Sequence, residues 1–160
     1  MPVQNSSPSI FSSPRNGWAL LPLALAAIAF AVPWLLARSP ELGLALQRGF
    51  ALVCHQQPDR SFVLFGGSVA VCARCLGIYL GAAAGLLLRV SRRVAMRCLI
   101  AAVAINLVDW SAELTGMHGN WLVARFALGF ALGMAGAMLV ASVEADRHLT
   151  TNHWQLNGRP

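Results

Sequence analysis

Residues 54–89 read CHQQPDRSFVLFGGSVAVCARCLGIYLGAAAGLLLR. The stretch leads from a loop with cysteines and a histidine into a segment that has no charged residue before Arg89. Gly77, Gly81 and Gly85 recur at every fourth position in this segment, so they share one face of a helix that a neighbouring backbone can approach closely. The stretch therefore predicts a membrane helix that carries polar chemistry at its start.

The composition of the whole chain supports a membrane location. Its 160 residues are 57% hydrophobic, with a mean hydropathy of +0.60, and the apolar runs are too long for an ordinary water-soluble core. The net charge of +6 comes from arginine alone, and the arginines lie between apolar segments rather than in one basic run. This pattern indicates a lipid bilayer as the partner and excludes a nucleic-acid-binding surface.

The apolar runs predict an all-α integral membrane protein with about four transmembrane helices. The second helix, counted from Cys75, rises only about 21 Å against the roughly 30 Å of a hydrocarbon core, so its cysteines are expected at the membrane boundary. Pro33 is expected to kink or end the first helix, and Gly116 to cap the third. The expected spans are residues 17–37, 75–89, 94–113 and 121–143, with Asn120 capping the fourth.

Two short elements are expected between the first and second spans. Ser39, Pro40 and Glu41 have the form of a helix start, and the helix that follows, to about Val53, is too short to span, which indicates an interfacial helix. Residues 61–71 predict a small β-hairpin-like loop that turns at Gly66-Gly67. The hairpin would fold Cys72 back toward Cys54.

The chain divides into a disordered N-terminal tail at 1–16, a helical membrane domain at 17–146 and a polar C-terminal tail at 147–160. A cleaved signal peptide is the rival interpretation of the first span. That span exceeds the roughly 7 to 15 apolar residues of a signal peptide, and residues 35–37 offer no cleavage site of small residues. We therefore expect the first span to remain in the protein.

The densest positive cluster predicts the topology. Because loops rich in arginine stay in the cytoplasm, Arg89, Arg92, Arg93 and Arg97 mark the second loop as cytoplasmic. Four crossings then place both termini in the cytoplasm of a bacterial cell, in a multi-pass protein of the inner membrane. The cysteines and His118 would lie on the outer face.

Asp109 and Arg125 are ionisable residues inside predicted spans, where such groups usually face a partner or a polar cavity. Their matching depth predicts a salt bridge, which Asn106 and Glu113 could extend into a polar network. A pair that only fixes the register of the two helices is the alternative interpretation.

The stretch CHQQPDRSFVLFGGSVAVCARCLGIYLG, with the later Asp109 and the Arg125, Gly129, Gly133 pattern, resembles domain of unknown function 2085, a family of predicted bacterial membrane proteins. The resemblance covers roughly residues 45–140 and implies a membrane location. It implies no activity, because none is established for the family. Its signature positions are Cys54, His55, Arg60, Cys72, Arg74, Cys75, Asp109 and Arg125.

Three chemistries remain open for the cysteines. Cys54, His55, Cys72 and Cys75 suit zinc or another thiolate-binding metal, with His118 as an alternative fourth ligand. Cys72 and Cys75 could instead form a redox pair that Arg74 and the helix dipole activate. A structural disulfide is the third interpretation, although three outer cysteines leave one thiol over.

A second class of function is a small membrane enzyme or transporter. Asp109 and Arg125, with Arg74 as a further catalytic candidate, would then handle an anionic or lipid-derived substrate, and the cysteines would form a structural disulfide. The glycine faces also allow a helix-packed oligomer. The chain has no P-loop, GxSxG or HExxH motif.

Overall fold

The computed structural model describes residues 14–117, 119 and 121–157. Most of these residues are helical, and one small antiparallel pair of strands interrupts the helices. The expectation of an all-α membrane protein with a short interfacial helix and a hairpin-like loop is confirmed. The elements are α1 Pro14–Arg38, α2 Pro40–Ala51, the 3-10 turn η1 Pro58–Arg60, β1 Val63–Leu64, β2 Gly67–Ser68, α3 Ala73–Leu87, α4 Arg92–Leu114 and α5 Leu122–Asn157.

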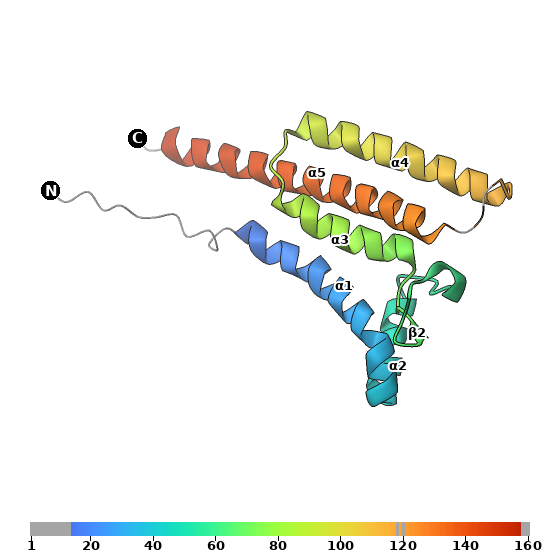
Figure 1. Cartoon of the computed structure of the whole chain (residues 1–160). Coiled ribbons are helices and arrows are strands. Elements are labelled where there is room, and N and C mark those ends of the chain that lie inside the picture. Colours follow the sequence, from blue (N-terminus) through green and yellow to red (C-terminus); the bar gives the residue numbers. More distant parts are fainter. Residues whose placement is uncertain (1–13, 118, 120, 158–160) are drawn as a thin grey trace.

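Helices α1, α3, α4 and α5 run side by side in one layered bundle (Figure 1). Helix α3 packs between α1 and α5, and α4 packs on α5. In the described part of the chain, three helices are long and apolar enough to cross a membrane, namely α1, α4 and α5, and the 15-residue α3 is shorter. The start of α1 and the end of α5 lie at the same end of the bundle, and α2 and the hairpin lie at the other (Figure 1).

Glycines hold α3 and α5 in backbone contact, as their spacing predicts. A Cβ atom added at Gly77 or Gly81 would overlap the carbonyl oxygen of Phe126 or Phe130 on α5. In the other direction, a Cβ at Gly129 would overlap the carbonyl oxygen of Arg74 on α3. Small residues on both helices therefore set the distance between them.

The helix ends agree with the sequence in part. Helix α1 continues through Pro33 and ends at Arg38, so the proline does not end it. Gly116 has a φ of +69° just after α4, and this left-handed conformation is the expected cap. Helix α5 continues beyond the expected end at 143, to Asn157, and Asn120 lies outside the described residues.

The hairpin forms with a turn one residue earlier than expected. Leu64 pairs with Gly67, so the two turn residues are Phe65 and Gly66, which have φ values of +52° and +80°. Positive φ at both central positions is typical of the type I′ turns that join twisted strands. This register turns Phe62 and Leu64 toward the core, whereas a slip by one residue would turn them to the opposite side.

A compact core connects the hairpin end of the bundle to α1 and α3. The backbone N–H of Ala70 donates to the carbonyl of Ala29 over 3.3 Å, which fixes the end of the hairpin against α1. Small side chains allow this close approach. The buried residues of this core are Ala26, Ala29, Val32, Phe50, Cys54, Val69, Ala70, Val71 and Leu76.

Candidate functional site

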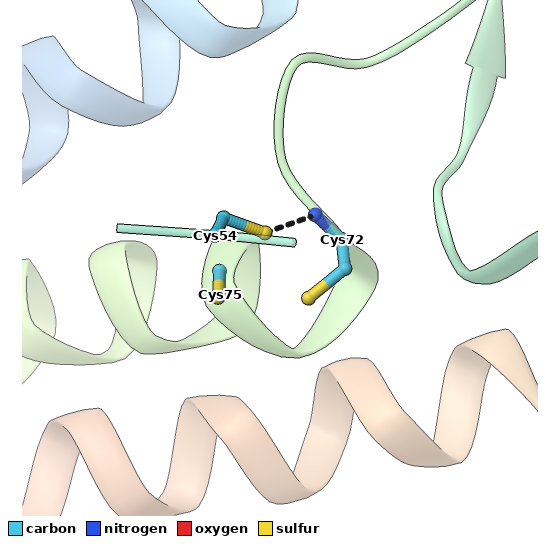
Figure 2. Close-up of side chains that lie close together, drawn as sticks. All are labelled: Cys54, Cys72 and Cys75. Atoms are coloured by element: carbon cyan, nitrogen blue, oxygen red, sulfur yellow. Dashed lines mark hydrogen bonds between the residues drawn. The ribbon is translucent and has the colours of Figure 1, made fainter. Parts of the chain in front are cut away.

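Three cysteines meet where the hairpin returns to α3. Cys54 follows the last turn of α2, Cys72 directly precedes α3, and Cys75 lies in the first turn of α3. Their Sγ atoms all lie within 4.8 Å of one another, and Figure 2 shows the three side chains gathered at the start of α3. Cys54 is buried and the other two are half-buried. The sequence prediction that the hairpin folds Cys72 toward Cys54 is therefore confirmed.

The loop after Cys54 is held in place by the amide of Gln56. Its Nε2 donates to the carbonyl oxygen of Gln47 on α2 over 2.6 Å and to that of Ala70 after the hairpin over 2.8 Å. Gln56 itself has a φ of +49°, an unusual conformation for a residue other than glycine. These two hydrogen bonds tie α2 to the segment between β2 and Cys72, and so they hold the loop that carries Cys54 close to the start of α3.

The environment of Cys54 favours its thiolate. Hydrogen bonds from the thiols of Cys72 and Cys75, together with the backbone N–H of Cys72, lower the pKa of Cys54 below its usual range. The backbone contact runs from the Cys72 nitrogen to the Cys54 sulfur over 3.2 Å (Figure 2). All three residues and Cys98 are free thiols in the structure. The cluster is therefore suited to ligands or reactions that need a thiolate.

Of the two histidines predicted as metal ligands, only His55 lies within the described residues. His55 is exposed, and the close group of potential ligand atoms among the described residues consists of the three sulfurs alone. His118 lies outside the described residues. Cys98 is exposed on α4, away from the cluster.

A hollow of about 350 Å³ opens beside the cysteines. It brings the sulfurs together with guanidinium groups from three separate parts of the chain. Its described walls contain three arginines and no Asp or Glu. The lining residues are Val53, Cys54, His55, Gln56, Gln57, Arg60, Cys72, Arg74, Cys75 and Arg125.

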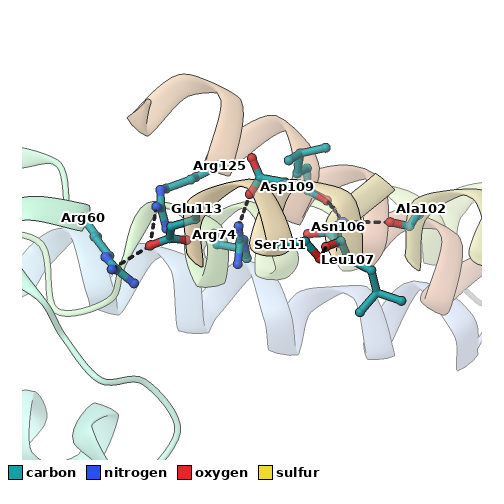
Figure 3. A network of polar contacts seen from close by, with 10 residues as sticks. Arg60, Arg74, Ala102, Asn106, Leu107, Asp109, Ser111, Glu113 and Arg125 are labelled. Carbon is teal, nitrogen blue, oxygen red and sulfur yellow. Dashed lines mark hydrogen bonds and ion pairs between the residues drawn. The ribbon is translucent and has the colours of Figure 1, made fainter. Parts of the chain in front are cut away.

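The three arginines of the hollow form ion pairs with carboxylates, chiefly those of Glu113 and Asp109 (Figure 3), and Nε of Arg60 also lies 3.9 Å from Oδ2 of Asp59. Nη2 of Arg125 lies 2.8 Å from Oε1 of Glu113, and Nη2 of Arg60 lies 2.6 Å from the same oxygen. Nη2 of Arg74 donates to Oδ2 of Asp109. The network therefore links α3, α4 and α5 to η1, the turn before the hairpin.

The predicted direct bridge between Asp109 and Arg125 gives way to two bridges with other partners. Both residues line a second hollow of about 350 Å³, so their predicted match in depth is correct. Arg125 nevertheless binds Glu113, one helical turn beyond Asp109, and Asp109 binds Arg74. The two carboxylates share one face of α4 at a spacing of four, which places Glu113 in the network but does not decide which of the two meets Arg125.

Asn106 lies one turn before Asp109, but its side-chain amide binds backbone carbonyls and not the charged side chains. Its Nδ2 donates to the carbonyl oxygens of Ala102 over 2.9 Å and of Leu128 over 3.2 Å. The second bond joins α4 to α5. Asn106 therefore holds two helices together, in line with the usual behaviour of amides in membrane bundles.

Comparison with known proteins places this arrangement in a family. A family model described as a predicted membrane protein, DUF2085, matches residues 54–139. The uncharacterized protein MJ1492 of Methanocaldococcus jannaschii is 34% identical over 99 residues, which cover 58% of this chain and 64% of the relative. An uncharacterized protein of Methanothermobacter thermautotrophicus is 34% identical over 95 residues, which cover 56% of this chain and 86% of the relative.

No solved structure matches the chain. Both relatives are archaeal, so the family extends beyond the bacterial proteins that the resemblance implied. The matched region begins at Cys54 and contains all three clustered cysteines, the three arginines of the hollow and both carboxylates behind them. This chain belongs to the DUF2085 family of predicted membrane proteins.

Proposed function

We propose that this membrane protein binds a thiolate-preferring metal ion, zinc in the first instance, through Cys54, Cys72 and Cys75. The observation that carries the proposal is the mutual approach of the three sulfurs to within 4.8 Å. Thiolates are the preferred ligands of zinc and copper(I) in proteins. The lowered pKa of Cys54 supports the same assignment, because metal binding requires the deprotonated thiol.

A metal ion would require only a small movement of the sulfur atoms. Zn–S bonds of about 2.3 Å in a tetrahedral site place two sulfurs about 3.8 Å apart. The largest separation within the cluster is 4.8 Å, so the thiols would have to close by about an ångström at most. Rotation of side chains provides a movement of this size without a change in the backbone.

The fourth coordination position would face the hollow. Three protein ligands and one open position are typical of zinc sites that bind a water molecule or a substrate. His55 lines the same hollow and is the nearest described histidine in sequence to the cluster, so we assign it as the optional fourth ligand. His118 keeps the same role as an alternative from the sequence.

Thiol redox chemistry is the second candidate, and the thiolate character of Cys54 favours it. Exchange with another protein's disulfide needs an accessible sulfur. Cys54 is only 5% exposed, which favours its service as a ligand over attack on a large partner. A structural disulfide among the three cysteines is the corresponding oxidised form.

A direct role for Asp109 and Arg125 as the catalytic pair of an enzyme or transporter has less support. Each already has a partner of opposite charge, and the carboxylates lie behind the arginines rather than on the walls of the hollow. We assign Asp109 and Glu113 the task of orienting the arginines.

The proposed location is the cytoplasmic membrane, with the cysteine cluster on its outer face and both chain ends in the cytoplasm. The arginines between α3 and α4 and at the start of α4 support this orientation, because they lie at the end of the bundle opposite the cluster. The metal site would then be open to the exterior.

Elemental analysis of detergent-purified protein, kept reduced throughout, tests the metal site. The expected result is one zinc or copper ion per chain in the wild type and in Cys98→Ser, and less than a tenth of that in Cys72→Ser and Cys75→Ser. Cys98→Ser is the matched control, because Cys98 is an exposed thiol away from the cluster. Equal metal content in the wild type and Cys72→Ser would refute the proposed ligands.

A further inference from the structure

Three arginines line the hollow beside the cysteines, and its described lining has no carboxylate. Arg60, Arg74 and Arg125 come from η1, α3 and α5. Ion pairs with Glu113 and Asp109 hold them in place, and all three residues belong to the wall of the hollow. We propose that this wall binds a phosphate-type oxyanion, either as free phosphate or as the phosphate of a lipid headgroup.

Arg125 supplies an observation that is independent of the charge cluster. Its side chain is only 7% exposed, and its Nε atom is buried without a hydrogen-bond partner among the described residues. Nε of Arg74 is likewise buried without a hydrogen-bond partner among the described residues. Buried guanidinium nitrogens are normally satisfied, because an unmade hydrogen bond of a charged group is costly. The ion pairs with Glu113 and Asp109 therefore leave donor capacity unused on two of the arginines that line the hollow.

The geometry of arginine selects the class of ligand. A guanidinium group presents a planar fork of donors that matches two oxygens of a phosphate or carboxylate. A carboxylate presents two oxygens in one plane, whereas a phosphate presents three or more oxygens in different directions and can meet arginines that come from three separate elements. The hollow is also large enough at about 350 Å³ to hold a group of this size.

The anion site does not depend on a metal. The arginines are positioned by carboxylates rather than by the cysteines, so the wall should persist when the cluster is removed. This allows the two proposals to fail separately. Binding of phosphate to a Cys72→Ser variant would support the arginine site whether or not the wild type contains metal.

The test uses full-length protein in detergent, titrated with inorganic phosphate and followed by the ³¹P NMR line width and the thermal unfolding midpoint. Chloride at matched ionic strength corrects for screening. The expected result is saturable binding to the wild type and to Cys72→Ser, weakened roughly tenfold or more in Arg60→Gln by loss of one charge-assisted hydrogen bond. Arg97→Gln, at the opposite end of the bundle, is the matched control and should bind as the wild type does.

A second arm separates the two sources of phosphate. The protein is placed in phosphatidylcholine nanodiscs with or without phosphatidic acid, and bound lipid is measured by native mass spectrometry after release. Binding of phosphatidic acid without binding of free phosphate, abolished in Arg60→Gln, would assign a lipid headgroup. Arg60 is 38% exposed, so its substitution is expected to leave the bundle folded even if Arg125→Gln does not. Failure of both ligands to bind, or equal binding by Arg60→Gln and the wild type, would overturn the proposal.

Discussion

Arg125 and Arg60 share a single carboxylate oxygen, Oε1 of Glu113, at distances of 2.8 and 2.6 Å. Arg125 belongs to the transmembrane helix α5, Glu113 to α4, and Arg60 to the turn before the hairpin. One oxygen atom therefore connects two membrane helices to the loop that follows Cys54. This contact couples the stability of the bundle to the position of the candidate site.

Replacement of Glu113 by glutamine is expected to destabilise the protein. Arg125, which is 7% exposed, would keep its charge and lose its counter-ion. Loss of one partner from a buried ion pair typically costs on the order of 3 kcal/mol. The measurement is thermal or denaturant-induced unfolding in detergent, with Glu41→Gln on the exposed surface of α2 as the control.

A double-mutant cycle isolates the bond itself. If Glu113 and Arg125 interact as the structure places them, Glu113→Gln combined with Arg125→Gln should cost less than the sum of the single changes, with a coupling of about 1–3 kcal/mol. Strict additivity would mean that the two side chains are independent. The same cycle for Asp109 and Arg125 should give a smaller coupling, because Asp109 binds Arg74.

Substitution of Gly81 by alanine tests the contact between α3 and α5. The added Cβ would overlap the carbonyl oxygen of Phe130, which belongs to backbone and cannot rotate away, so the helices must separate. Overpacking of this kind typically costs about 1–3 kcal/mol.

Gly136→Ala is the matched control within α5. A Cβ at Gly136 meets nothing within 4 Å among the described residues, so alanine there should be neutral or should stabilise the helix by up to about 1 kcal/mol. An equal change in the unfolding midpoint for Gly81→Ala and Gly136→Ala would show that contact with the Phe130 backbone does not constrain Gly81.

The periodicity of the sequence was sufficient to predict the helices and the close contact through glycines, because both depend on the spacing of residues along one helix. Partner choice was harder. Spacing places Asp109 and Glu113 on one face of α4, but the rotation of α4 against α5 decides which of them meets Arg125. That rotation depends on side chains from several helices at once, so one helix's pattern cannot supply it.

The candidate site, too, could be predicted only in part from local sequence patterns. The turn residues and strand patterns of 61–71 were enough to predict that Cys72 returns to Cys54, and the sulfurs do meet. The hydrogen bonds of Gln56 to Gln47 and Ala70, which fix this return, join residues 9 and 14 positions apart through an unusual backbone conformation. No local pattern signals such a bond.

The Cys54 thiolate predicts a pH dependence in metal-free, reduced protein. Because hydrogen bonds lower the pKa of Cys54 in the folded state, its thiolate stabilises the fold above the ordinary thiol pKa of about 8.5. This contribution should decline as the pH falls from there toward the folded pKa. The difference in unfolding midpoint between the wild type and Cys54→Ser should therefore be larger at about pH 8 than at about pH 5.

Ultraviolet absorbance provides a second test of whether the Cys54 thiol is ionised. Near neutral pH the wild type should show a thiolate band that Cys54→Ser lacks, and Cys98→Ser should retain it because Cys98 lies apart from the cluster. Absence of the band in freshly reduced wild-type protein would contradict the assignment of the thiolate to Cys54.

Removal of the metal is expected to destabilise only those proteins that keep all three clustered cysteines. A ligand that binds only the folded protein at 1,000 times its dissociation constant adds about 4 kcal/mol of stability. A chelator should therefore lower the unfolding midpoint of the wild type and of Cys98→Ser, and leave that of Cys75→Ser unchanged. An equal fall in Cys75→Ser would place the chelated ion elsewhere in the protein.

The orientation in the membrane can be tested with cysteines placed at the two ends of the bundle. Asp59, in η1, and Ser91, between α3 and α4, are both exposed, and they lie at opposite ends. In a Cys98→Ser background, an impermeant maleimide should label Asp59→Cys in intact cells and Ser91→Cys only after permeabilisation. The arginines at 89, 92, 93 and 97 favour this result, since basic loops remain in the cytoplasm. The parent Cys98→Ser protein corrects for labelling of the cluster itself, and the reverse pattern would place the cysteine site in the cytoplasm, where the reducing environment would keep its thiols free without a metal.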